Sequence, residues 1–147
     1  MKRFVAFIVF ALIAFSAFSQ QVNSNDLKTF CINFSEAVLS GDVEKCLEFF
    51  DPGYLKIQHQ DFLNERSEQF LNEFLTLYLA FDYNDDNAKQ ASFRDIKSMI
   101  LFEIATDNAN NKIVVYFINL KNGSYYYLTA KLKIFDNNKF GFFGAVG

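Results

Sequence analysis

The sequence has little of the material from which nucleic-acid and metal sites are built. It has one histidine and no run of basic residues, and 17 acidic residues outnumber 14 lysines and arginines, for a formal net charge of −3. Nucleic acids and anionic lipid surfaces attract basic patches, so both are poor candidates for partners. A metal site needs several convergent ligands, which one histidine with scattered acids does not supply. We therefore expect neither a metal nor another cofactor.

Proline and cysteine are also scarce, and no glycine-rich phosphate loop is present. The glycines of GFFGAVG fall within and at the end of a predicted strand that no helix follows, unlike those of a phosphate loop. Cys31 and Cys46 permit one disulfide, and the alternative is two buried free thiols that act as small hydrophobic residues. A nucleophilic Cys46 would need a nearby base, and its place on an apolar helical face argues against that role.

The chain begins with the pattern of a secretory signal peptide. Two basic residues precede an apolar stretch over residues 4–15, and Ala17 and Ser19 supply the small residues before a cleavage site. The apolar run is short against the ~20 residues that span a bilayer. We predict a cleaved signal peptide over residues 1–19, no stable membrane anchor, and a secreted or periplasmic protein. Cleavage removes two cations, so the net charge falls from −3 to −5.

Hydrophobic spacing predicts helices in the first half of the mature chain. An amphipathic helix over residues 25–39 is expected to end at Gly41, because glycine suits the left-handed position after a helix. Asp42 then caps a second, short helix, which the sequence Asp51-Pro52-Gly53 stops.

The rest of the mature chain is predicted to be one more helical region followed by strands. Residues 54–81 are predicted to be helical with a break near residues 64–67, and residues 81–91 form a polar loop. Segments rich in β-branched and aromatic residues then predict four strands. These strands are residues 95–105, 112–120, 125–135 and 139–146.

Two turns set the expected register of the last three strands. Asn122-Gly123 and Asn137-Asn138 predict two-residue hairpin turns, which place Leu128, Leu132 and Phe143 on the inner face of the sheet. The outer face is then rich in aromatic residues, which predicts that something covers it. The residues expected at a dimer interface on this face are Tyr116, Tyr125, Tyr127, Phe140 and Phe142.

The stretch FSEAVLSGDVEKCLEFFDPGY resembles the opening helical pair of the NTF2-like (nuclear transport factor 2, cystatin-like cone) superfamily, in which GD marks the joint between the two helices. The predicted order of elements over the whole mature chain is also that of this superfamily. The resemblance implies an α+β fold in which N-terminal helices pack in a curved antiparallel four-stranded meander. It further implies a conical pocket and a homodimer through the outer face of the sheet. We therefore expect one such domain over residues 20–147.

The interior predicted by this register departs from that of NTF2-like enzymes such as ketosteroid isomerase and scytalone dehydratase. Those enzymes work with acids, histidines and tyrosines inside the cone, whereas the inward positions here hold no group that titrates near neutral pH. Glu103 is the one strand acid that another register would turn inward. Small residues on adjacent strands leave a volume that either a helix phenylalanine fills or an apolar ligand occupies. The residues expected at such a pocket are Tyr54, His59, Asn119, Tyr126, Ala130 and Gly141.

The sequence thus favours a non-catalytic binding domain for a small apolar ligand or a protein partner. The alternative is an isomerase- or hydrolase-like enzyme that uses His59 as a general base, with Asp61 or Glu65 orienting it. A lone histidine in a polar segment is a weak signal for such a site. The third alternative is a purely structural secreted module.

Overall fold

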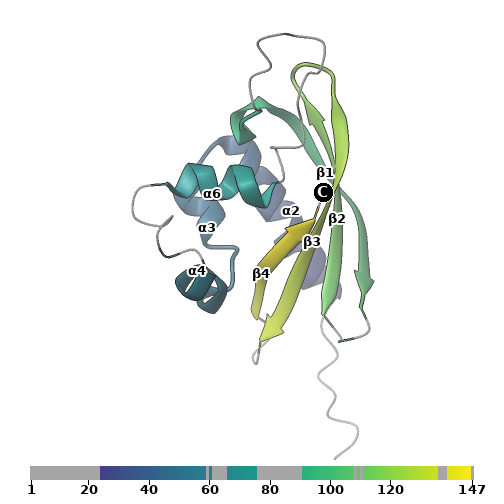
Figure 1. The fold of residues 1–147 in the computed structure, drawn as a ribbon. Coiled ribbons are helices and arrows are strands. Elements are labelled where there is room, and N and C mark those ends of the chain that lie inside the picture. The colour runs from purple at the N-terminus through teal and green to yellow at the C-terminus, as the bar shows by residue number, and fades with distance from the viewer. Residues whose placement is uncertain are drawn as a thin grey trace, which may run out of the picture.

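Helices come first along the chain and a four-stranded sheet comes last (Figure 1). The structure, a computed structural model, describes residues 24–58, 60, 66–75, 91–107, 109, 111–135 and 139–146. The helices lie on one side of the sheet, which confirms the predicted α+β class. They are α2 (Ser24–Ser40), α3 (Val43–Leu47), α4 (Pro52–Gln58) and α6 (Ser67–Phe74), with a single 3-10 turn, η2 (Phe93–Asp95), before the sheet.

The joint between α2 and α3 has the predicted capping chemistry. Gly41 adopts a φ of +74°, the left-handed conformation that glycine reaches without strain. The carboxylate of Asp42 accepts a hydrogen bond from the backbone N–H of Lys45 at 3.1 Å, which satisfies a free donor in the first turn of α3. Pro52 is the first residue of α4. Proline lacks an N–H, but the first N–H groups of a helix have no partner within the helix, so no hydrogen bond is lost there.

The predicted second helical region is interrupted, as expected. A new helix, α6, starts at Ser67. The residue at its N-cap position is Arg66, whose side chain makes no capping hydrogen bond. Most of the predicted polar loop over residues 81–91 lies outside the described residues, as do residues 61–65.

The sheet is an antiparallel meander in the order β1-β2-β3-β4. Its strands end within one residue of the predicted bounds: β1 (Ile96–Thr106), β2 (Lys112–Leu120), β3 (Tyr125–Phe135) and β4 (Lys139–Val146). The chain before α4 runs beside the outer edge of β4. There Phe50 forms a parallel bridge with Phe142, and the N–H of Asp51 donates to the carbonyl of Phe142 at 2.9 Å.

The register between β2 and β3 differs from the prediction by one residue. Tyr116 lies opposite Leu128, and Asn119 lies opposite Tyr125. The turn therefore has three loop residues after Leu120, of which the last, Gly123, has a φ of +92°. A three-residue loop with a left-handed third residue is the second common way to close a hairpin. Because side chains alternate along a strand, this single step turns the opposite face of β2 toward the helices.

The register between β3 and β4 is correct at one end of the strands and shifted at the other. Ala130 lies opposite Ala145 as predicted, but an irregularity beside Lys131 and Leu132 moves the partner of Leu132 from Phe143 to Phe142. Phe142 is fully buried, whereas Phe143 is half-buried. A β-bulge of this kind re-aims the side chains that follow it.

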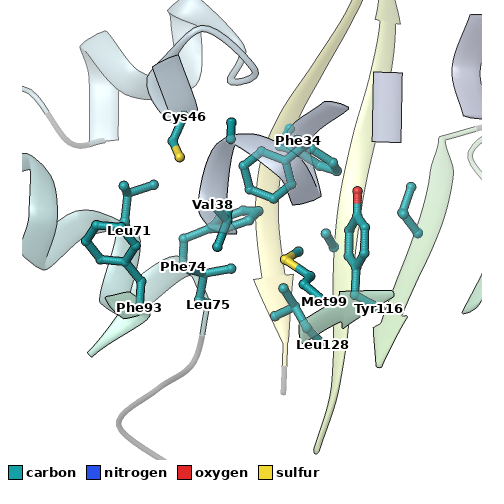
Figure 2. Packing of buried hydrophobic residues seen from close by; sticks show 14 of the residues in the cluster. Phe34, Val38, Cys46, Leu71, Phe74, Leu75, Phe93, Met99, Tyr116 and Leu128 are labelled. Carbon is teal, nitrogen blue, oxygen red and sulfur yellow. The ribbon is translucent and has the colours of Figure 1, made fainter. Parts of the chain in front are cut away.

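Aromatic rings fill the centre of the core between the helices and the sheet (Figure 2). Phe34 of α2 is fully buried, and its ring centroid lies 4.8 Å from that of Phe142 and 6.1 Å from those of Phe74 and Tyr116. Pairs of this kind contribute about 0.5–1.5 kcal/mol beyond the burial of their area. Phe34 of α2 therefore joins the helices to the sheet in the middle of the core.

Candidate functional site

The described core contains no constellation suited to catalysis. Ser35 is its one buried polar side chain outside tyrosine and cysteine, and its hydroxyl donates to the carbonyl of Cys31 within the same helix at 3.2 Å. Glu103, the one strand acid considered for the interior, is exposed and lies opposite Val115 on the outer side. The described residues also include no group of three or more histidine, cysteine or acidic side chains placed to hold a metal. His59, the general base of the enzymatic alternative, lies outside the described residues.

The two cysteines are buried free thiols, so the disulfide considered between them is not formed. Both side chains are fully buried and belong to the hydrophobic core, where each packs as a small apolar group. Burial raises the pKa of Cys31 to about 11. Burial, together with the negative charge of Asp42, raises the pKa of Cys46 to about 12. Both thiols are therefore neutral at physiological pH, which is the opposite of what a nucleophile or a metal ligand requires.

We expect these thiols to make the fold sensitive to alkali. Their ordinary pKa is 9.0, and the folded values are higher. The unfolded chain therefore loses protons first as the pH rises, and folding stability falls above pH 9. The loss is complete for each thiol once the pH passes its folded pKa of about 11 or 12. Within that window each thiol contributes a slope of up to about 1.4 kcal/mol per pH unit.

Urea unfolding at a series of pH values measures this slope. A variant with Cys31→Ala and Cys46→Ala should lose the part of the slope that begins at pH 9. The part due to the buried tyrosines Tyr116 and Tyr126, whose pKa values burial also raises, should remain. An unchanged slope in the double variant would show that the thiols are already accessible in the folded protein.

The structure does not gather the residues predicted to line a ligand pocket. Asn119 lies on the outer face of the sheet, where its amide donates to the hydroxyl of Ser98 at 2.9 Å. Tyr126 lies on the inner side, and its hydroxyl donates to the carbonyl of Leu75 at 2.7 Å. Both were expected at the same pocket, and the shifted register places them on opposite faces of the sheet.

The remaining residues of the predicted pocket are dispersed as well. Ala130 is buried in the core. Gly141 lies against the backbone of Asp51 at the edge of β4, and Tyr54 is half-buried on α4 with its ring 6.4 Å from that of Phe70.

Three of the five residues predicted for the dimer face lie on the wrong side of the sheet. Tyr116 and Phe142 are fully buried, and Phe140 packs against the core. The hydroxyl of Tyr116 donates to the carbonyl of Cys31 at 3.0 Å, which satisfies its one polar atom inside the core. Tyr125 and Tyr127 do lie on the outer face, with 67% and 48% of their surface exposed.

The outer face nevertheless carries an aromatic cluster, built partly from residues that the sequence analysis missed. The ring of Phe117 lies 5.6 Å from that of Tyr125 and 5.1 Å from that of Tyr127. Phe102 of β1 packs edge-on against Tyr127 at 5.4 Å and stays 63% exposed, and Ile100 beside it is 55% exposed. We call the five residues of this cluster the outer patch: Ile100, Phe102, Phe117, Tyr125 and Tyr127.

The described surface includes two hollows of a size that could hold a small ligand. One, of about 300 Å³, runs between α2 and β1 and includes Ile32, Leu39 and Met99. The other, of about 360 Å³, lies where α4 meets β3 and β4. We call the second hollow the α4 cleft. Its lining residues are Asp51, Gly53, Tyr54, Ile57, Lys133 and Phe143.

Neither protein-family models, nor curated proteins, nor solved structures match this chain.

None of the described helices combines the length and the apolar character that a bilayer crossing requires. The function is therefore inferred from the residues of the chain itself.

Proposed function

We propose that this protein is an exported, non-catalytic binding domain that forms a homodimer through the outer patch. One observation carries the proposal: aromatic and aliphatic side chains from three adjacent strands form one exposed cluster on the side of the sheet that the described helices leave open (Figure 1). Contiguous apolar surface of this kind marks an interaction site. Tyrosine and phenylalanine are also enriched at the centres of protein interfaces.

The charges around the outer patch favour a second copy as the partner. Exposed Glu103 lies beside the patch on β1, and exposed Lys131 lies on the outer side of β3. A two-fold axis parallel to β2 would bring β1 of one copy over β3 of the other. Each acidic side chain would then approach the basic side chain of the partner, so one self-complementary surface would supply both halves of the interface.

We further propose that the chain has the NTF2-like arrangement and is exported. The helix joint at Gly41 and Asp42, the meander order of the sheet and the helices on one of its faces are what that arrangement requires. The signal-peptide pattern over residues 1–19 supports export.

Charged substitutions in the outer patch should dissociate the dimer without unfolding the chain. We expect Phe102→Lys and Tyr127→Lys each to weaken self-association at least about tenfold, because a buried ammonium without a partner opposes association. Light scattering after size-exclusion chromatography measures the mass, and circular dichroism reports on the fold. Ile57→Lys is the matched control, since Ile57 is 83% exposed on α4, outside the patch. A wild-type chain that elutes with the mass of a monomer at every concentration would contradict the proposal.

A further inference from the structure

The α4 cleft has charges of both signs at fixed places and lies apart from the outer patch. Asp51 precedes α4, while Lys133 projects from the outer side of β3. Tyr54, Ile57 and Phe143 add an apolar lining to the cleft. An apolar hollow with a few fixed polar groups is the usual form of a small-molecule site.

The carboxylate of Asp51 is held by the backbone around it. Its N–H donates to Phe142 at 2.9 Å, and its carbonyl accepts from Leu55 at 3.0 Å. One carboxylate oxygen, Oδ1, accepts the N–H of Gly53 at 2.9 Å, which leaves Oδ2 for another donor. The close approach of Asp51 to β4 depends on Gly141, since a Cβ there would meet the Asp51 nitrogen at 2.8 Å. The acidic group therefore has a defined place before any ligand arrives.

The ammonium of Lys133 is also held near the cleft. Its Nζ lies 5.1 Å from the centre of the Phe135 ring, within range of a cation–π contact. Asp51 and Lys133 line the same hollow but do not form an ion pair with each other. The salt bridge found within the described residues is elsewhere, between Arg94 and Glu68. The cleft thus offers separate places for a cationic and an anionic group of one ligand.

We propose that the α4 cleft binds a small zwitterion with an apolar body, of the class of apolar α-amino acids. The ammonium of the ligand would bond to Oδ2 of Asp51, and its carboxylate would face Nζ of Lys133. Its side chain would lie on Phe143, Tyr54 and Ile57. The volume of about 360 Å³ is within the range of small-ligand sites. This site does not depend on self-association through the outer patch.

Titration of the isotope-labelled wild-type protein with L-phenylalanine tests the site by amide chemical shifts. We expect saturable shifts at Gly53, Tyr54 and Phe143. N-acetyl-L-phenylalanine lacks the ammonium and L-phenylalanine methyl ester lacks the carboxylate, so each should bind at least about tenfold more weakly, the loss expected when a charged hydrogen bond is removed. Equal affinity for all three compounds would overturn the proposal, as would the absence of shifts at these amides up to millimolar ligand.

Two variants assign the charges in the same titration. Lys133→Met and Asp51→Asn should each weaken L-phenylalanine binding about tenfold or more. Lys56→Met is the matched control, because Lys56 is exposed on α4 and does not line the cleft. If Asp51→Asn disturbs the turn before α4, the comparison of L-phenylalanine with its N-acetyl and methyl ester derivatives on the wild-type protein still tests whether the cleft binds both charges. Equal loss in the control variant would contradict the assignment to Lys133.

Discussion

Phe34→Ala is expected to lower the free energy of unfolding by about 3–5 kcal/mol, a large part of the 5–15 kcal/mol typical of a domain of this size. The Phe34 side chain is fully buried, and its ring contacts those of Phe50, Phe74, Tyr116 and Phe142. These neighbours come from both the helices and the sheet, so they cannot all close over the cavity that alanine would leave. Urea unfolding followed by circular dichroism measures the loss.

The control for this prediction is an exposed aliphatic residue. Ile57 is 83% exposed, and Ile57→Ala should change the free energy of unfolding by no more than about 0.5 kcal/mol. Should Phe34→Ala fail to fold, the milder Phe34→Leu keeps the measurement within reach. A loss below 1 kcal/mol for Phe34→Ala, on the order of an average substitution, would show that the helices and the sheet do not share the aromatic core described above.

Gly141→Ala is expected to lower the free energy of unfolding by about 1–3 kcal/mol, the usual cost of forcing extra atoms into a packed site. A Cβ at this position would lie 2.8 Å from the backbone nitrogen of Asp51 and 3.0 Å from both its Cα and the ring of Phe135. Two of these three atoms belong to the backbone. The chain before α4 must therefore move away from β4, which weakens the bridge between Phe50 and Phe142.

Gly144 provides the matched control on the same strand. A Cβ at Gly144 would meet no atom within 4 Å, and its φ is not positive. Gly144→Ala should therefore be neutral or stabilise the fold by up to about 1 kcal/mol, because alanine reduces the freedom of the unfolded chain. Comparison of the two urea midpoints is the measurement. Equal effects at Gly141 and Gly144 would contradict the close approach of residues 49–51 to β4.

The helices and strands could be predicted because their signals are local. Gly41 and Asp42 end one helix and start the next through their own backbone and side-chain chemistry. The strands are long runs of β-branched and aromatic residues between polar turns, which fixes their ends to within one residue. None of these signals depends on contacts between distant segments.

The faces of β2 could not be predicted, for two reasons. Asn122-Gly123 suits either a two-residue or a three-residue loop, because both place Gly123 at a positive φ. In addition, both faces of β2 are apolar, so composition does not separate the inner Tyr116 from the outer Phe117. Predicting a two-residue loop in place of a three-residue loop therefore exchanged the inner and outer faces of β2. The exchange placed no polar or charged side chain of β2 in an unsuitable position that would have revealed it.

The candidate sites were predictable to different degrees. Tyr125 and Tyr127 were placed on the outer face correctly, because the pattern of β3 is clear and does not change with the loop. The α4 cleft had no local signal. It arises where the segment before α4 lies beside β4, and that contact joins Asp51 to residues far along the chain.

Hydroxyl-radical footprinting of the wild-type protein over a range of concentrations would test whether the outer patch is an interface. We predict that oxidation of Phe102, Tyr125 and Tyr127 decreases several-fold as the concentration rises and copies pair, while oxidation of the exposed Ile57 on α4 stays constant. Oxidation of all four residues that does not change with concentration would contradict self-association. A decrease at Ile57 without one at the three aromatic residues would place the interface on the helical side of the molecule.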